Sequence, residues 1–243
     1  MSLPRFHSPT ALAAGSQVEL SSSAAHHVAK VLRMRVGDAL ILFDGLGGEY
    51  SAHIEGIEKK RVVAGVDSHA DIERESPLVI TLVQAVSAGD RMDVTLQKAV
   101  ELGVSRILPV MSKRSVVRLS GERAEQRMQH WQQVVIAACE QCGRNRVPQV
   151  EALVPLAAFL QQPRPRADRW MLSPQAEQAL RTVEKPRTEL ELLVGPEGGL
   201  TVDEERAAGD AGFKPVRIGP RILRTETAAP ALLAASQALW GDF

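Results

Sequence analysis

From residue 78 to the C-terminus, short apolar runs alternate with segments of helical periodicity, and this alternation constrains the fold more than any other feature. The runs have the length and composition of buried strands and occupy residues 78–83, 106–111, 169–172, 190–194 and 216–218. Helices are expected over residues 91–102, where Gly103 follows as a stop, over residues 122–142, and after each of the last three runs. Such alternation predicts a mostly parallel sheet with helices on both faces.

The first seventy or so residues have a different pattern, in which shorter strand-like runs are separated by turn residues. These runs occupy residues 17–20, 39–43, 50–54 and 61–66. Regularly spaced short strands are typical of a small barrel or sandwich. One helix is expected within it, capped by Ser22 or Ser23 and running to Met34. The polar stretch 71–77 predicts a linker, so we expect two domains, residues 1–72 and 73–243.

Composition excludes some classes of protein. The 243 residues carry 29 basic and 29 acidic side chains, so the net charge is zero and any contact with nucleic acid must come from local patches. No stretch approaches the roughly 18 apolar residues that span a bilayer. The N-terminus shows no apolar signal core behind basic residues, so we expect a cytoplasmic protein with no membrane partner.

Two strand-to-helix turns have unusual sequences. The first is GPEGG at residues 195–199, directly after an apolar run, and Thr201 and Glu204 then form the pattern of a capping box. Three glycines in five residues let the backbone approach a ligand closely, and the free N–H groups of the following helix point towards it. Ligands of open α/β sheets bind at the carboxyl ends of the strands, where this turn lies.

The second turn is IGPRILRTET at residues 218–227, where Pro220 stiffens the loop and a helix is expected to begin near Thr225 or Thr227. Both turns also fit ordinary strand-to-helix connections with good caps, because tight glycine turns are common in α/β folds. Neither is a phosphate-binding fingerprint. The sequence has no G-x-G-x-x-G after a strand and no G-x-x-x-x-G-K-[ST], which argues against a dinucleotide oxidoreductase and a P-loop ATPase.

At this spacing, GPEGG followed by IGPRILRTETA closely resembles the ribosomal RNA uracil-N3 methyltransferases (RsmE type) of the SPOUT superfamily. The resemblance extends along the chain to HHVAKVLRMR at residues 26–35, QKAVELGV at 97–104 and ACEQCGRNRVP at 138–148. One departure is Pro230, which lies early in the last helix. Proline is tolerated in a first helical turn, so we expect no disturbance of the site.

The resemblance implies an α/β protein with an N-terminal PUA-like β-barrel that contacts RNA and a C-terminal SPOUT α/β domain with a deep trefoil knot. It implies S-adenosylmethionine as methyl donor, no metal, ribosomal RNA or the small ribosomal subunit as substrate, and a homodimer. The donor would bind in the knot. From the matched loops, the expected donor-binding residues are Leu172, Pro174, Gly195, Glu197, Gly198, Ile218, Gly219, Leu223 and Thr225.

Basic residues outside the donor loops are candidates for RNA contact. Lys30, Arg33 and Arg35 cluster in the smaller domain, and residues 113–146 carry seven basic side chains against three acidic ones. A solvated helix face gives the same pattern. Phosphate contact is the better interpretation for an RNA substrate. The expected RNA-binding residues are Arg5, Lys30, Arg33, Arg35, Arg114 and Arg144.

The chemistry at uracil N3 requires loss of a weakly acidic proton, and a cation beside the base would stabilise the negative charge that develops on its carbonyl oxygens. Arg224 is the expected cation, because it lies in a loop that also holds the donor. Glu226 is a candidate proton acceptor, although a capping or structural role fits the sequence equally well. Cys139 and Cys142 continue an apolar helical stripe, so core packing is expected rather than zinc binding.

Two other functions fit the same sequence. One is a non-catalytic RNA-binding or ribosome-assembly factor that kept the fold but not the activity, and such a module would not bind S-adenosylmethionine. The other is a SPOUT methyltransferase that acts on a different RNA, such as transfer RNA. The sequence does not identify the target nucleotide.

Overall fold

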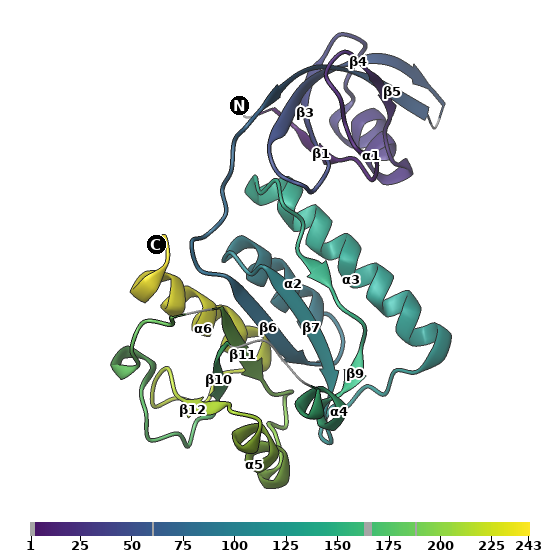
Figure 1. Cartoon of the computed structure of the whole chain (residues 1–243). Coiled ribbons are helices and arrows are strands. Elements are labelled where there is room, and N and C mark those ends of the chain that lie inside the picture. The colour runs from purple at the N-terminus through teal and green to yellow at the C-terminus, as the bar shows by residue number, and fades with distance from the viewer. Residues whose placement is uncertain (1–2, 60, 163–166, 188) are drawn as a thin grey trace. The chain divides into compact units, whose positions relative to one another are not determined.

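The computed structural model describes residues 3–59, 61–162, 167–187 and 189–243 (Figure 1). Its internal contacts divide the chain into two units. Residues 1–75 and 136–147 form the first unit, and residues 76–135 and 148–243 form the second. Every helix within the described ranges is too short or too polar to cross a membrane.

The first unit contains a five-stranded mixed sheet with the order β1-β3-β4-β5-β2. β1 (Arg5–His7) pairs in parallel with β3 (Ala39–Phe43), β4 (Glu49–Glu58) and β5 (Arg61–Ala70) form a long antiparallel hairpin, and β2 (Gln17–Glu19) is antiparallel to β5. The predicted small β unit is confirmed. β1 was not predicted, because Phe6 is its single apolar residue.

The helix expected over residues 22–34 is two helices of different type. α1 (Ser22–His26) is followed by a π-helix, η1 (His27–Leu32), and α1 is capped by Ser21 rather than by Ser22 or Ser23. Three consecutive serines give the same capping signal, so the sequence did not distinguish them. η1 ends at Arg33, whose φ of +54° lies in the left-handed region that residues other than glycine seldom adopt.

A buried ionic network joins β1 and β4 to the end of α3 (Gly121–Cys142) inside the first unit. Arg5 donates hydrogen bonds to Glu49 at 2.6 Å and to Asn145 Oδ1 at 2.5 Å. Arg74 donates to Glu49 at 3.0 Å and to the Gly143 carbonyl at 2.9 Å. The segment that follows α3 therefore belongs to the N-terminal unit, although it lies about seventy residues beyond the predicted linker.

The second unit contains a parallel sheet with the order β12-β10-β11-β6-β7-β8, and β9 also pairs with β7. Its strands are β6 (Ile80–Ala85), β7 (Arg106–Met111), β8 (Gln149–Val150), β9 (Val154–Pro155), β10 (Asp168–Leu172), β11 (Leu190–Val194) and β12 (Lys214–Val216). All the strand pairs are parallel, as predicted. The first and last strands are offset by two residues from the predicted runs, because the apolar pattern extends into the adjoining loops.

Helices cover both faces of this sheet, which confirms the predicted layers. On one face, α4 (Leu156–Gln161) and α5 (Val202–Asp210) pack together over a cluster that includes Val83 and Ala85 of β6. Gln84, which alternates with them, contacts Thr225 of α6 (Thr225–Trp240). α6 packs against α2 (Arg91–Glu101), so this pair lies on the opposite face.

Two local predictions about the helices were wrong. Among the described residues between β10 and β11, only a short 3₁₀ helix, η2 (Leu180–Thr182), occurs, where a full helix was expected. α6 begins at Thr225, which places Pro230 in its second turn rather than its first. Because proline has no N–H, the Glu226 carbonyl loses its intrahelical hydrogen bond. The capping box of α5, made by Thr201 and Glu204, is confirmed.

Candidate functional site

A cavity of about 280 Å³ lies at the carboxyl ends of β10, β11 and β12. The sheet order places β10 between the other two strands, so their following loops converge and form the cavity walls together with the start of α6. All nine predicted donor-binding residues line this cavity: Leu172, Pro174, Gly195, Glu197, Gly198, Ile218, Gly219, Leu223 and Thr225. The structure thus brings together residues that the sequence separates by up to 53 positions (225 − 172).

The GPEGG loop needs glycine at two positions for reasons within the chain itself. A Cβ at Gly195 would lie 3.1 Å from the Leu200 amide nitrogen, which is tighter than ordinary contact. Gly199 has a φ of +68°, a conformation that residues with a side chain rarely adopt. At Gly198, a Cβ would lie 3.3 Å from the Cβ of Arg114, so a side chain there would also press on its neighbour. The loop therefore brings its backbone close to the cavity.

Gly219 differs from these glycines. Its φ lies outside the left-handed region, and no atom lies within 4 Å of the position that a Cβ would occupy. Nothing in the described chain therefore requires glycine there. A ligand in the cavity would supply the reason, because Gly219 lines the wall.

The carboxylate of Glu197 is held by the start of α2. Its Oε1 accepts hydrogen bonds from the Ala88 N–H at 2.8 Å and from Arg91 Nη1 at 3.0 Å. Partial burial opposes ionisation of this group, but the hydrogen bonds from Ala88, from its own backbone and from Arg91 outweigh burial and lower the pKa of Glu197. Glu197 is therefore a carboxylate at neutral pH, with its charge compensated by Arg91.

Buried polar groups support the cavity from beneath. The Thr225 hydroxyl, almost fully buried, donates to the Gly195 carbonyl at 3.1 Å. Gln84 Nε2 lies 3.4 Å from the Thr225 oxygen, and Ser87 Oγ lies at the same distance. The hydrogen bond from Thr225 to the Gly195 carbonyl fixes the start of the GPEGG loop to the first residue of α6.

Arg114 was predicted to contact RNA, which stays a prediction, and the structure places its exposed side chain on the cavity wall. Its Nη1 donates to the Gly198 carbonyl at 2.9 Å and to the Leu200 carbonyl at 3.2 Å. The guanidinium therefore holds the second half of the GPEGG loop. The sequence suggested no such contact, because the two segments lie 84 residues apart.

The two predicted catalytic residues flank Thr225 but do not line the cavity. Arg224 is the N-cap residue of α6 and its side chain is exposed. Glu226 is partly buried, and its Oε2 lies 3.7 Å from Arg91 Nε. Among the described residues this oxygen has no hydrogen-bond partner. Glu226 is therefore the less solvated of the two.

Sequence reasoning missed three cations at the site. Arg217 and Arg221 line the cavity and are exposed, and Arg91 lies behind Glu197. Arg221 lies inside the IGPRILRTET turn, so its place in a ligand-facing loop was a usable signal. Arg91 carried no signal, because its role depends on a partner 106 residues away.

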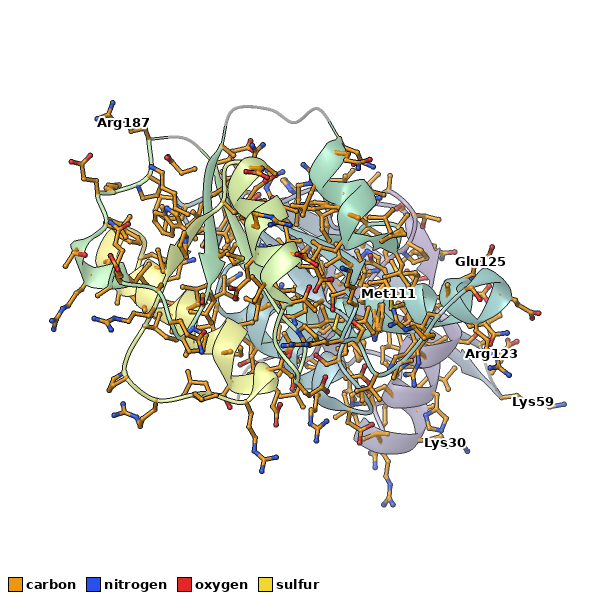
Figure 2. All side chains as sticks on the ribbon, turned by 90° about the horizontal axis from the view of Figure 1, so that it is seen from below. Lys30, Lys59, Met111, Arg123, Glu125 and Arg187 are labelled. Atoms are coloured by element: carbon orange, nitrogen blue, oxygen red, sulfur yellow. The ribbon has the colours of Figure 1, made fainter. Side chains whose placement is uncertain are left out.

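The predicted RNA-binding residues fall into two groups. Lys30, Arg33 and Arg35 are exposed around the end of η1, and Figure 2 shows Lys30 extending away from the ribbon. Arg5 and Arg144 are used internally. Arg5 bonds to Glu49 and Asn145, and Arg144, which is 4% exposed, pairs with Glu75 through both of its carboxylate oxygens. Neither side chain is free to reach a phosphate, so we do not retain them as RNA contacts.

Cys139 is fully buried and Cys142 is partly buried, in line with the expected packing role. Burial raises the pKa of the Cys139 thiol to about 12, so it is not a thiolate at neutral pH. Within the described part of the chain, no three His, Cys, Asp or Glu side chains are arranged to hold a metal ion.

A parallel α/β sheet with a glycine-walled cavity at its carboxyl edge, joined to a small β unit, is consistent with the class of RNA methyltransferases that carry a PUA domain, and two family models identify this class. The family model described as RNA methyltransferase domain matches residues 74–237, and the one described as RNA methyltransferase PUA domain matches residues 20–67. The chain belongs to the ribosomal RNA small subunit methyltransferase E family.

Individual relatives agree with this assignment. The chain is 31% identical to the ribosomal RNA small subunit methyltransferase E of Buchnera aphidicola, over 92% of this chain and 88% of the relative. It is similar to the crystal structure of that enzyme from Neisseria gonorrhoeae bound to S-adenosylmethionine, with 43% identity, a TM-score of 0.92 and full coverage of both chains. A putative methyltransferase from Legionella pneumophila, in complex with the same cofactor, has 39% identity, a TM-score of 0.96 and full coverage of both chains.

Proposed function

We propose that this chain transfers a methyl group from S-adenosylmethionine to N3 of a uracil in small-subunit ribosomal RNA. The observation that carries the proposal is the cavity formed by the loops after β10, β11 and β12. Its relatives from Neisseria gonorrhoeae and Legionella pneumophila bind S-adenosylmethionine. We assign the PUA-like RNA-binding domain to residues 1–72 and methyl transfer to residues 73–243, which also carry a second basic surface for RNA.

The residues of the cavity fit this donor. Residues 195–199, 218–219 and 221–223 line the cavity, and Gly219 leaves open space that no part of the described chain fills. When bound, S-adenosylmethionine supplies an electrophilic methyl group on a positively charged sulfur. The trefoil knot implied by the family resemblance stays a prediction.

Electrostatic stabilisation of the uracil is the chemical task that we assign to the basic side chains of the last loop. Negative charge develops on the carbonyl oxygens of the base as its N3 proton leaves. Arg224 is the proposed cation for this charge, and the exposed Arg221, in the same loop, extends the positive field at the cavity wall. Positioning rather than covalent help from the protein dominates such a transfer.

Glu226 has two possible roles, proton acceptor and structural group. The absence of a hydrogen bond to its Oε2 among the described residues favours the first, because a free carboxylate oxygen can accept a proton. Its approach to Arg91 at 3.7 Å favours the second. A Glu226→Gln variant separates the roles, since loss of the proton acceptor lowers kcat and leaves S-adenosylmethionine affinity unchanged.

RNA binding is assigned to two basic surfaces, each described within its own unit. The first consists of Lys30, Arg33 and Arg35 around the end of η1. On the second, Arg123 and Arg127 lie one helical turn apart on α3 and line a shallow groove with Leu119, Gln126 and His130. Figure 2 shows the Arg123 side chain reaching outward from the first turns of α3. Both surfaces are suited to backbone phosphates.

A homodimer is the proposed oligomeric state, and the support comes from α6. Ala235, Ala238 and Leu239 of this helix line a largely apolar groove together with Leu180, Ile218 and Pro220, and Arg181 and Arg217 also line it. Leu232 and Leu233, by contrast, are fully buried inside the unit and are not available to a partner. We place the protein in the cytoplasm, where ribosomal subunits are assembled.

Methylation of RNA tests the proposed function directly. Small ribosomal subunits from cells that lack the enzyme would be incubated with labelled S-adenosylmethionine, and the modified base would be mapped. The expected product is one 3-methyluridine in the small-subunit RNA. If the protein bound that RNA but not S-adenosylmethionine, it would be a non-catalytic assembly factor. If the label appeared in transfer RNA, the substrate would be transfer RNA and not ribosomal RNA.

A further inference from the structure

Arg91, the first residue of α2, lies between two carboxylates, one on the cavity wall and one in the first turn of α6 beside the cavity. Its Nη1 donates to Glu197 Oε1 at 3.0 Å, and its Nε lies 3.7 Å from Glu226 Oε2. Glu197 belongs to the GPEGG loop and Glu226 to the first turn of α6. One guanidinium therefore connects the loop and α6 to α2.

The start of α2 makes a second contact with the same carboxylate. The Ala88 N–H donates to Glu197 Oε1 at 2.8 Å, so two hydrogen bonds to this side chain come from residues 88–91. Positive potential at the N-terminus of a helix also favours a carboxylate there. Glu197 thus anchors its loop on α2, although it lies on the cavity wall.

Other contacts hold the GPEGG loop on either side of Glu197. Thr225 holds the Gly195 carbonyl and Arg114 holds the Gly198 carbonyl, so Glu197 is the anchor between them. A loop that binds its ligand through backbone groups must be held in one conformation, because ordering it on binding costs affinity. The contact with Arg91 supplies this order at the middle of the loop.

We infer that Arg91 is a positioning residue for the methyl donor, which holds the GPEGG loop through Glu197 and the start of α6 through Glu226. The inference rests on the proposed function and adds the start of α2 to the elements that form the donor site. A planar guanidinium can serve two carboxylates at once, whereas the ammonium of lysine is a point charge with less reach in two directions.

The exposure of the Arg91 side chain distinguishes a positioning role at the donor site from a role in stabilising the fold. Its side chain is 42% exposed. Ion pairs this exposed add little to folding stability. Loss of Arg91 should therefore alter donor affinity much more than the unfolding temperature.

Calorimetric titration of the full-length protein with S-adenosylmethionine tests the inference. Arg91→Met should weaken donor binding about tenfold, and Arg91→Lys should restore part of the loss. Arg106→Met is a matched control, because Arg106 is 51% exposed and pairs with Glu151 at 2.9 Å away from the cavity. It should bind the donor as the wild type does, and all three variants should unfold at nearly the same temperature.

A double-mutant cycle identifies the partner through which Arg91 acts. If Arg91 acts through Glu197, adding Arg91→Met to Glu197→Gln should cause little further loss of donor affinity. In steady-state kinetics, Arg91→Met should raise the KM for S-adenosylmethionine about tenfold and change kcat less than about threefold. A role confined to folding would not produce this division between KM and kcat.

Two results would overturn the inference while leaving the proposed function intact. One is a folded Arg91→Met variant that binds S-adenosylmethionine as tightly as the wild type. The other is an equal loss of affinity in Arg106→Met. A wild-type protein that fails to bind S-adenosylmethionine would overturn the proposed function, and this inference with it.

Discussion

Gly195 and Gly219 both line the donor cavity, but their surroundings differ. A side chain at Gly195 would press on the Leu200 backbone, so substitution there disturbs the loop before any ligand is bound. At Gly219 the space for a side chain is open and the backbone angle is ordinary. Gly219 is therefore the residue at which ligand binding and folding can be separated most cleanly.

Gly219→Val should leave the protein folded and weaken S-adenosylmethionine binding at least about tenfold, because a branched side chain would fill space on the wall that the donor needs. Calorimetric titration together with thermal unfolding provides the measurement. Gly209→Val is a matched control, since Gly209 also has open space around its Cβ position but lies in α5, away from the cavity lining. Equal donor affinity in wild type and Gly219→Val would remove this loop from the site.

Gly198→Val should abolish donor binding. It is a less clean test than Gly219→Val, because the new side chain would also displace Arg114.

At the scale of elements, strands β1 and β4 and the segment after α3 are held together by ionic groups rather than by apolar packing alone. Glu49 of β4 is the centre of this contact, with Arg5 on one side and Arg74 on the other. A carboxylate this buried is costly unless both its charge and its hydrogen bonds are satisfied. The stability of the first unit therefore depends on the ionisation of Glu49.

Stability of the first unit should fall in acid because of Glu49. Burial alone would raise its pKa, but hydrogen bonds from Arg5 and Arg74 outweigh burial and lower the pKa below the ordinary value of 4.5. The stabilisation is therefore complete above pH 4.5 and is lost as the pH falls through the lower, folded-state pKa. Glu49→Gln should cost about 1–3 kcal/mol at pH 7. The difference from wild type should shrink below pH 4.5, as measured by urea unfolding across pH.

Glu58→Gln is the control for this experiment, because Glu58 lies on the same strand and is exposed. It should change the free energy of unfolding by less than about 0.5 kcal/mol at any pH. If the difference in the free energy of unfolding between Glu49→Gln and wild type stayed constant down to about pH 3, the pH dependence could not be assigned to ionisation of Glu49.

At the scale of the whole molecule, a protein of zero net charge must bind RNA through local surfaces. The double substitution Arg33→Glu and Arg35→Glu should weaken RNA binding without changing donor affinity. If each arginine contacts one phosphate, the slope of log affinity against log salt should flatten by about 1.4–1.8. Binding measured over a salt series gives this slope. Lys185→Glu with Arg187→Glu makes the same change of charge at exposed positions in the second unit, and an equal flattening there would argue against a local surface.

Oligomeric state is the second property of the whole molecule, and α6 provides the test. Leu239 is 44% exposed and lines the apolar groove. Leu239→Glu should convert a micromolar dimer into a monomer and lower activity, because burying a charge in an apolar contact is unfavourable. Analytical ultracentrifugation provides the measurement, and Val202→Glu, at an exposed apolar residue outside the groove, is the control. A fully active wild-type monomer would disprove the proposed dimer.

Local sequence was enough to predict most of the strands and helices of the second unit, whereas the cavity residues also needed the family resemblance. β7 and β11 were predicted to the residue, and α2, α3 and the α5 capping box nearly so, because these signals arise from neighbours a few positions apart. The cavity residues were found through two turns and a family resemblance. They converge because the carboxyl ends of neighbouring parallel strands meet at one edge of the sheet.

Tertiary structure alone decided which charged residues are free. Arg5, Arg144 and Arg114 were all predicted to contact RNA. Partners that lie 140 and 69 residues away in the sequence hold Arg5 and Arg144 inside the protein, whereas Arg114 stays exposed and donates to a loop carbonyl 84 residues away. The pairing of Arg91 with Glu197, 106 residues away, is of the same kind. A charged side chain is recognised in any sequence. Whether it contacts solvent, a ligand or a counter-ion depends on chain segments that only folding brings together.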